Sequence, residues 1–201
     1  MPGRFNVANA LVALAVSELA GLPIEDALAG IAHVVVPGRL QRIDEGQDYL
    51  AIVDYAHKPA AVAAVIATLR SEIKGRLCVV LGAGGDRDAS KRVIMGREAA
   101  RGSDLFIVTD DNPRSEDPAV IRAAVEAGAY ELPTEERGEV RNIGDRAAAI
   151  RAAIAWAEPG DAVLVAGKGH ETGQNVNGVI HHFDDREEVR AALQERRTGS
   201  L

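Results

Sequence analysis

Four short runs of β-branched and other apolar residues recur along the chain, and amphipathic segments separate them. The runs cover residues 50–54, 77–81, 105–109 and 162–166, and the helical patterns cover residues 59–73, 91–101, 118–127, 145–157 and 187–194. Continuous apolar strands that alternate with helices are typical of a parallel sheet covered on both faces. The sequence therefore predicts an α/β fold, with a shorter strand at residues 140–143 and an edge segment at 179–183.

The first 36 residues have a different pattern, because their apolar residues recur at helical spacing without an apolar run of the strand type. Pro23 stands where a second helix would begin, and Pro37 with Gly38 ends the pattern. We therefore expect a short helical segment at 1–36 and an α/β domain at 37–195. Two helices are too few to bury their own apolar faces, so the pair either packs on the α/β domain or belongs to a larger domain. The tail 196–201 is expected to be disordered.

Composition excludes several classes of protein. The net charge of -7 argues against a nucleic-acid-binding surface, and Cys78, the only cysteine, allows neither a disulfide framework nor a cysteine-based metal site. The sequence has no apolar run of about 20 residues and no signal-peptide pattern. We expect a cytoplasmic protein that binds no nucleic acid and does not insert into membranes.

Polar clusters follow each of the four apolar runs. They are residues 54–59, 82–88, 110–114 and 167–171. In an open α/β sheet, ligands bind beyond the carboxyl ends of the strands, where backbone groups and helix N-termini converge. One polar loop of this kind is ordinary turn chemistry, but four at one edge predict a binding site.

The glycine-rich loop at 82–88 does not match the common nucleotide motifs. A dinucleotide fingerprint requires a glycine where Arg87 stands, and Gly167-Lys168 is followed by glycine rather than by the Ser or Thr of a phosphate loop. An NAD-dependent oxidoreductase is therefore disfavoured. We expect Gly84-Gly85 to turn the backbone sharply, so that the following charged residues project toward the strand ends.

Charged side chains in these loops suggest the kind of ligand. Arg87 and Arg114 suit bidentate recognition of two carboxylates, while Glu171, Asp111 and the Asn112 amide could bind ammonium groups. The pattern favours a zwitterionic ligand. The alternative is a set of local ion pairs, with Arg87 neutralised by the neighbouring aspartates and Arg114 by Asp111.

Other polar residues allow more than one interpretation. His57 and His170 could be general bases, metal ligands or hydrogen-bonded loop residues, and neither is assigned a catalytic role. Asp54, at a strand end, could accept hydrogen bonds from ribose hydroxyls. Asn6 and Asn9 share one helix face, unless Asn6 is only an N-cap. Lys91 and Arg92 are expected to face solvent rather than phosphate.

Together these motifs resemble the Mur ligases of peptidoglycan synthesis, and among them the branch that adds meso-diaminopimelate. The resemblance rests on Phe5 to Leu11, Pro37-Gly38-Arg39, Asp54 to Pro59, Gly84 to Asp88, Asp111-Asn112-Pro113-Arg114 and Gly167-Lys168-Gly169-His170-Glu171. It implies a mostly parallel, Rossmann-like domain that positions the incoming amino acid in an ATP-dependent ligase. Residues 1–36 are similar to the closing helices of that family's central ATPase domain.

The resemblance also implies roles for particular residues. The amino-acid-binding residues would be Arg87, Asp111, Asn112, Pro113, Arg114, Gly167 and Glu171, and the ATP adenine and ribose would contact Asn6, Asn9, Arg39, Asp54 and His57. ATP and Mg²⁺ would serve the complete ligase, which joins meso-diaminopimelate to UDP-N-acetylmuramoyl-L-alanyl-D-glutamate, and no residue of this chain is assigned to a metal. Because the chain has no phosphate loop, it is expected to be inactive alone. The alternative is a freestanding amino-acid-binding module that acts with a separate ATPase chain.

Overall fold

The computed structural model describes residues 4–201. It divides into two compact units, Met1–Pro37 and Gly38–Leu201. The first three residues of the predicted helical segment 1–36 lie outside the described part.

The first unit is a pair of helices, α1 (Arg4–Leu19) and α2 (Ile24–His33). Pro23 stands directly before α2, as its position in the sequence predicts, and Gly21 takes a φ of +77° in the turn before it. No residue of α2 is buried, and Leu19 of α1 is 89% exposed. Among residues 6–37, whose burial the structure describes, none is buried, so this part of the pair forms no core of its own.

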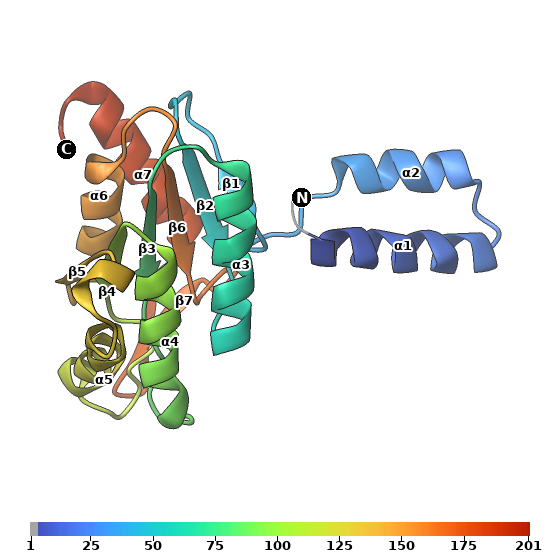
Figure 1. The fold of residues 1–201 in the computed structure, drawn as a ribbon. Helices are drawn as coiled ribbons and strands as arrows, with labels where there is room; N and C mark the ends of the chain where they lie inside the picture. Colours follow the sequence, from blue (N-terminus) through green and yellow to red (C-terminus); the bar gives the residue numbers. More distant parts are fainter. Residues whose placement is uncertain (1–3) are drawn as a thin grey trace. The chain divides into compact units, whose positions relative to one another are not determined.

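The second unit is built on a six-stranded sheet of order β1-β2-β6-β3-β4-β5 (Figure 1). Its strands are β1 (Gln41–Ile43), β2 (Leu50–Asp54), β3 (Leu77–Leu81), β4 (Leu105–Val108), β5 (Glu139–Asn142) and β6 (Ala162–Ala166). All neighbouring strands run parallel except β1, which pairs antiparallel with β2. β6 is the last strand of this sheet along the chain, but in the sheet it lies between β2 and β3.

Helices cover both faces of this sheet (Figure 1). On one face α3 (Pro59–Glu72), α4 (Ser90–Gly102) and α5 (Pro118–Tyr130) bury side chains such as Val79 and Phe106. On the other face α6 (Arg146–Trp156) and α7 (Asp185–Thr198) bury alternate strand residues such as Val80 and Val163. Successive side chains of a strand point to opposite faces, so a strand buried on both sides is apolar throughout. The predicted mostly parallel sheet with helices on both faces is confirmed.

Three local elements differ from the prediction. The sequence patterns do not predict β1, and the segment predicted at the sheet edge, residues 179–183, instead forms β8 (Val179–His182) in a separate hairpin with β7 (Gly173–Val176). The last helix extends to Thr198, into the segment predicted to be a disordered tail. It extends because the side chain of Arg196 donates to the carbonyl of Ile154 and because Gly199, with a φ of +73°, closes the helix end.

Candidate functional site

The four polar loops lie at the carboxyl ends of four adjacent strands. The strands are β2, β6, β3 and β4 in that order, so the loop after β6 lies between the loops after β2 and β3. The carboxyl ends of parallel strands face the same edge of the sheet. This edge includes the end of β6, the strand that is inserted between β2 and β3. The four loops therefore lie at one edge of the sheet, as the sequence predicts.

Glycines bring the loops after β3 and β4 into direct contact. The N–H of Gly85 donates to the carbonyl of Asn112 at 2.9 Å, and a Cβ on Gly85 would lie 1.9 Å from the carbonyl oxygen of Pro113. The positive φ of this loop falls on Asp86, at +52°, and not on Gly84 or Gly85. The glycines are thus needed for close approach between loops rather than for the sharp turn that the sequence predicted.

Arg114 lies against the loop that carries Arg87. Its Nη1 donates to the carbonyl of Gly85 at 2.6 Å, and its own backbone is held at a φ of +53°. The N–H of Arg114 donates to the carbonyl of Asn175, and its own carbonyl accepts from Asn177. Arg114 is half-buried, whereas Arg87 is exposed and donates only to the backbone carbonyl of Asp86 within the described residues.

The alternative interpretation, local ion pairs, is wrong for these loops. The Asp86 carboxylate accepts from the side chain and the N–H of Ser115, and the Asp88 carboxylate accepts from Ser90. In residues 4–201, no ion pair joins either aspartate to Arg87 or joins Asp111 to Arg114. Within the described residues, neither predicted guanidinium group is ion-paired with these aspartates.

The expectation that Arg92 faces solvent is also wrong. Its side chain is 4% exposed and makes a bidentate pair with Glu116, at 2.9 and 2.8 Å. The same carboxylate accepts from the N–H of Asp86, and these contacts hold the pKa of Glu116 below its usual value, with the Arg92 hydrogen bonds as the main cause. Lys91 donates to the carbonyl of His57. Arg92 thus ties the loops after β3 and β4 together.

Asn112 and Glu171 meet between the loops after β4 and β6. The Asn112 Nδ2 donates to Glu171 Oε2 at 2.9 Å, although the two residues are 59 positions apart. Beneath them lies Lys168, whose side chain has no exposed surface and donates to Asn112 Oδ1 at 3.2 Å. Asp111 is buried beside Gly167, where a Cβ would lie 2.8 Å from Asp111 Oδ2. Of the predicted residues, Asn112 and Glu171 are thus in contact.

Sequence reasoning missed a buried ion pair below the site. Arg146 and Asp185 have no exposed side-chain surface and pair at 2.7 and 2.8 Å. Arg146 also donates to the carbonyls of Ala166 and Asp110, at the ends of β6 and β4. Burial acts to lower the pKa of Arg146, but the Asp185 carboxylate outweighs it and the pKa is raised. In the sequence both residues begin helices and resemble solvated side chains, so no signal could have paired them.

In the loop after β2, the ring of Tyr55 is in contact with one guanidinium group and two histidine rings. The Arg39 guanidinium lies 4.4 Å from its ring centroid, and the rings of His57 and His170 lie 4.5 and 5.2 Å away. The predicted residues Arg39 and His57 therefore lie in one cluster, and Tyr55, which the sequence analysis did not single out, is its centre. A cation–π contact at an exposed position is worth about 0.5–1 kcal/mol.

Asp54, beside this cluster, is already engaged with the backbone. Its two oxygens accept from the N–H groups of Leu40 and Ala56, at 2.7 and 2.8 Å. Burial raises the pKa of this carboxyl, and the two backbone N–H groups act against that shift. Asp54 therefore holds β2 to the segment before β1, and its binding of a ribose stays a prediction.

Asn6 and Asn9 belong to the other unit. Both lie inside α1, and Asn9 Nδ2 donates to Asn6 Oδ1 at 3.5 Å. They share a face as predicted, and the alternative that Asn6 is an N-cap is wrong because the helix already begins at Arg4.

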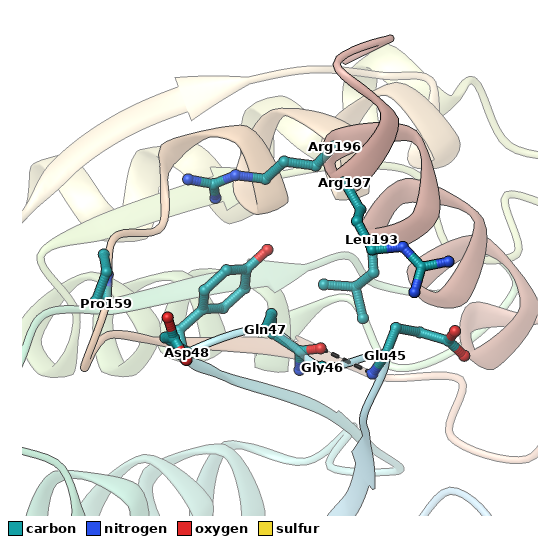
Figure 2. A pocket seen from close by; sticks show the side chains of 9 residues that line it. Glu45, Gly46, Gln47, Asp48, Pro159, Leu193, Arg196 and Arg197 are labelled. Atoms are coloured by element: carbon teal, nitrogen blue, oxygen red, sulfur yellow. Dashed lines mark hydrogen bonds between the residues drawn. The ribbon is translucent and has the colours of Figure 1, made fainter.

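A hollow, shown in Figure 2, is lined by residues next to the amino ends of β2 and β6, at the edge of the sheet opposite the four loops. It has a volume of about 290 Å³ and is lined by Glu45, Gly46, Gln47, Asp48, Tyr49, Pro159, Leu193, Arg196 and Arg197. None of the predicted binding residues is among them. Glu45 is paired with Arg190 at 3.3 Å and accepts from Gln194. This hollow is therefore separate from the four loops.

The described part of the chain contains neither a cluster of metal-binding side chains nor a helix that could span a membrane. Among residues 4–201, no group of three or more His, Cys, Asp or Glu side chains is arranged to hold a metal ion. Over the same residues, no helix is both long and apolar enough to cross a bilayer.

The fold and the loops define an α/β domain with a candidate ligand site at the carboxyl edge of a mostly parallel sheet. The family model of the Mur ligase glutamate ligase domain matches residues 38–169, most of this domain. The chain belongs to the Mur ligase family. The resemblance drawn from its motifs is thereby confirmed.

Relatives of known name are similar to this chain over most or all of its length. The UDP-N-acetylmuramoyl-L-alanyl-D-glutamate--2,6-diaminopimelate ligase of Corynebacterium glutamicum is 62% identical over 100% of this chain and 39% of its own length. A solved structure of a ligase of the same name is 39% identical, with a TM-score of 0.76 over 98% of this chain and 40% of the other. A folylpolyglutamate synthase of Mycobacterium tuberculosis, solved with ADP, is 26% identical, with a TM-score of 0.60 over 83% of this chain and 38% of the other. The chain thus spans about two fifths of the relatives it matches.

Proposed function

We propose that this chain is the amino-acid-binding part of an ATP-dependent ligase that adds meso-diaminopimelate to UDP-N-acetylmuramoyl-L-alanyl-D-glutamate in peptidoglycan synthesis. The names of its relatives support this assignment, since the C. glutamicum ligase is 62% identical over the whole chain. Such a ligase forms an amide bond, and the share of this domain in the reaction is to hold the amino acid in place. Orientation of that kind can contribute several kcal/mol to catalysis.

The observation that carries the proposal is the arrangement of charge in the four loops. Arg114, Asn112 and Glu171 lie on neighbouring loops, and Arg114 contacts the loop that bears Arg87. A diamine with two carboxylates has four charged ends, which two guanidinium groups and acidic or amide oxygens complement. Arg87 would hold the carboxylate beside the reacting amine. The distal end would bind the other predicted residues, namely Asp111, Asn112, Pro113, Arg114, Gly167 and Glu171.

Lysine would be the disfavoured substrate. It has the distal ammonium but no distal carboxylate, so it would leave Arg114 without a partner in a closed site. Leaving a buried polar group unpaired can give discrimination of about 10⁴-fold.

ATP would bind partly on this chain and partly outside it. Arg39 and His57, clustered on Tyr55, together with Asp54, Asn6 and Asn9 would contact the adenine and ribose. The M. tuberculosis folylpolyglutamate synthase, which is similar in fold, was solved with ADP. The sequence has no Gly-x-x-x-x-Gly-Lys-Ser/Thr loop, and the described carboxylates do not form a magnesium site on their own. We therefore assign the triphosphate and Mg²⁺ to the remaining parts of the ligase, and expect the chain alone to be inactive.

Residues 1–36 would be the closing helices of the central ATPase domain, and residues 37–195 the amino-acid-binding domain. The support is that α2 buries none of its residues, so its apolar side chains need a surface beyond the helix pair. A freestanding module with a separate ATPase chain is the competing arrangement. Reading the DNA upstream of Met1 separates them, since an in-frame phosphate loop supports the longer ligase and a stop codon supports the module.

The proposed substrate can be tested on the 201-residue chain. Calorimetric titration with meso-diaminopimelate should show binding at millimolar ligand, while lysine should bind at least tenfold more weakly, because one charge-assisted contact is worth about 1.5–3 kcal/mol. Arg114→Ala should abolish the difference between the two ligands. Equal binding of the two ligands to the unaltered chain would contradict the proposal.

Activity needs a longer protein. We define the chimeric ligase as the C. glutamicum relative in which the matched segment is replaced by this chain, which covers it at 62% identity. It should add meso-diaminopimelate in preference to lysine, and Arg114→Ala should raise KM for diaminopimelate about 10- to 100-fold with little change in the unfolding midpoint. A chimeric ligase that folds but incorporates lysine equally well would overturn the assignment.

A further inference from the structure

Lys168 is a buried cation to which neither the sequence pattern nor the proposed function gives a role. It lies between Gly167 and Gly169, whose φ angles are +116° and +55°. A Cβ on Gly169 would lie 2.6 Å from the Cβ of Tyr55, so this loop accepts only glycine on either side of the lysine. The two turns direct the Lys168 side chain inward, where it has no exposed surface.

Within the described residues, the ammonium group of Lys168 makes three close polar contacts. Its Nζ donates to the Gly173 carbonyl at 2.7 Å and to Asn112 Oδ1 at 3.2 Å, and it lies 3.6 Å from Glu171 Oε2. Burial lowers the pKa of Lys168, and the Asp111 carboxylate is the largest opposing influence. The lysine thus touches both Asn112 and Glu171 from below.

These contacts decide which way the Asn112 amide faces. Its Oδ1 accepts from Lys168 Nζ and from the N–H of Asn175, at 3.2 and 2.9 Å. An ammonium and a backbone N–H can only donate, so a rotated amide would place its own NH₂ against two donors. The orientation in place leaves Nδ2 to donate to Glu171 Oε2. Within the described residues, Glu171 Oε1 has no hydrogen-bond partner, and the side chain is 36% exposed.

We propose that Lys168 is a positioning residue for substrate choice: it locks the Asn112 amide so that the site presents an N–H donor and a free Glu171 oxygen to the distal end of the amino acid. This inference rests on the proposed function, since it concerns the same site. Lys168 itself touches no substrate. Its effect passes through Asn112 and Glu171, which it holds in one donor and acceptor pattern.

The test uses Lys168→Met in the chimeric ligase, because methionine fills a similar volume without a donor. KM for meso-diaminopimelate should rise about 10- to 100-fold, and the preference over lysine should fall by a similar factor. KM for ATP should stay within about twofold, whereas a structural disturbance that spread to the nucleotide-binding residues would raise it as well. Lys74→Met is the matched control, since Lys74 is exposed in the segment between α3 and β3, at the opposite edge, and should change none of these values.

A double-mutant cycle separates positioning from a merely structural role. In an Asn112→Ala background, Lys168→Met should raise KM for diaminopimelate much less than it does in the unaltered ligase, because the Asn112 amide that it orients is already absent. Additive effects would overturn the proposal. If Lys168→Met does not fold, Lys168→Gln keeps a donor and should raise this KM less than Asn112→Ala does. A larger rise would count against the proposal.

Failure of the proposal and failure of the proposed function give different results. If the unaltered chimeric ligase shows no preference for diaminopimelate, the proposed function is wrong. If it does show the preference and Lys168→Met retains it, the function stands and the role of Lys168 is wrong.

Discussion

Replacing Arg146 by methionine should destabilise the second unit strongly. Arg146 and Asp185 have no exposed side-chain surface, and removing one partner of such a pair costs about 3–5 kcal/mol because the other charge stays buried. The carbonyls of Ala166 and Asp110 also lose a donor. A loss of about 4 kcal/mol is a large fraction of the usual 5–15 kcal/mol of a domain. In a domain of this size it corresponds to a fall in Tm of about 8–16 °C.

Guanidinium chloride unfolding at pH 7, followed by circular dichroism, measures this effect. The matched control is Arg42→Met, since Arg42 pairs with Asp44 at 2.9 Å with both side chains more than half exposed, and it should cost less than about 1 kcal/mol. The double variant Arg146→Met/Asp185→Leu should be more stable than Arg146→Met, because neither charge is then buried alone. If Arg146→Met costs no more than Arg42→Met, or if the double variant is the less stable one, the reasoning from buried charge is refuted.

Two further changes test the loops. Gly38→Ala should cost more than about 2 kcal/mol, because Gly38 has a φ of +66° and the added Cβ would lie 2.2 Å from the backbone of Gly169. Gly46→Ala is its control, with a φ of +89° but open space, and should cost about 1 kcal/mol; equal losses in thermal unfolding would reject the steric argument. For Glu116→Gln the prediction concerns pH. Since Arg92 lowers the pKa of Glu116 below its ordinary 4.5, the carboxylate stabilises the fold above pH 4.5, and that stability is lost as the pH falls through the lowered pKa. The stability difference between the wild type and this variant should therefore shrink below pH 4.5, and a difference that is the same at pH 7 and pH 3 would contradict the prediction.

The strands of the sheet centre could be predicted with their bounds. Residues 50–54, 77–81 and 162–166 are β2, β3 and β6 as observed, because a strand buried on both faces is a continuous apolar run with polar residues at its end. β1 and β7 could not be found in this way. They contain three and four residues, with polar side chains that resemble those of a loop, and they are strands only because a neighbouring strand pairs with them.

The candidate site was predicted in part. The sequence indicated that Asn112 and Glu171 lie at the same edge, because each follows a strand of one parallel sheet. It did not indicate their contact, which depends on the proximity of the loop after β6 to the loop after β4. Lys168 and Arg92 resembled ordinary charged side chains of a loop and a helix, yet both are buried. Their partners are Asn112 and Glu116 on the loop after β4, and sequence patterns do not record such distant pairs.

The sequence alone determined the α/β class, the placing of four polar loops at strand ends and, through those loops, the family. These properties depend on local patterns, since apolar periodicity and turn residues act within a few positions of the chain. Only the tertiary structure decided that β6 lies between β2 and β3, that Arg146 pairs with Asp185, and that Lys168 holds Asn112. The physical reason is that burial and hydrogen bonding between distant residues exist only once the sheet has assembled, and a buried charge is then stable only beside the partner that the fold provides.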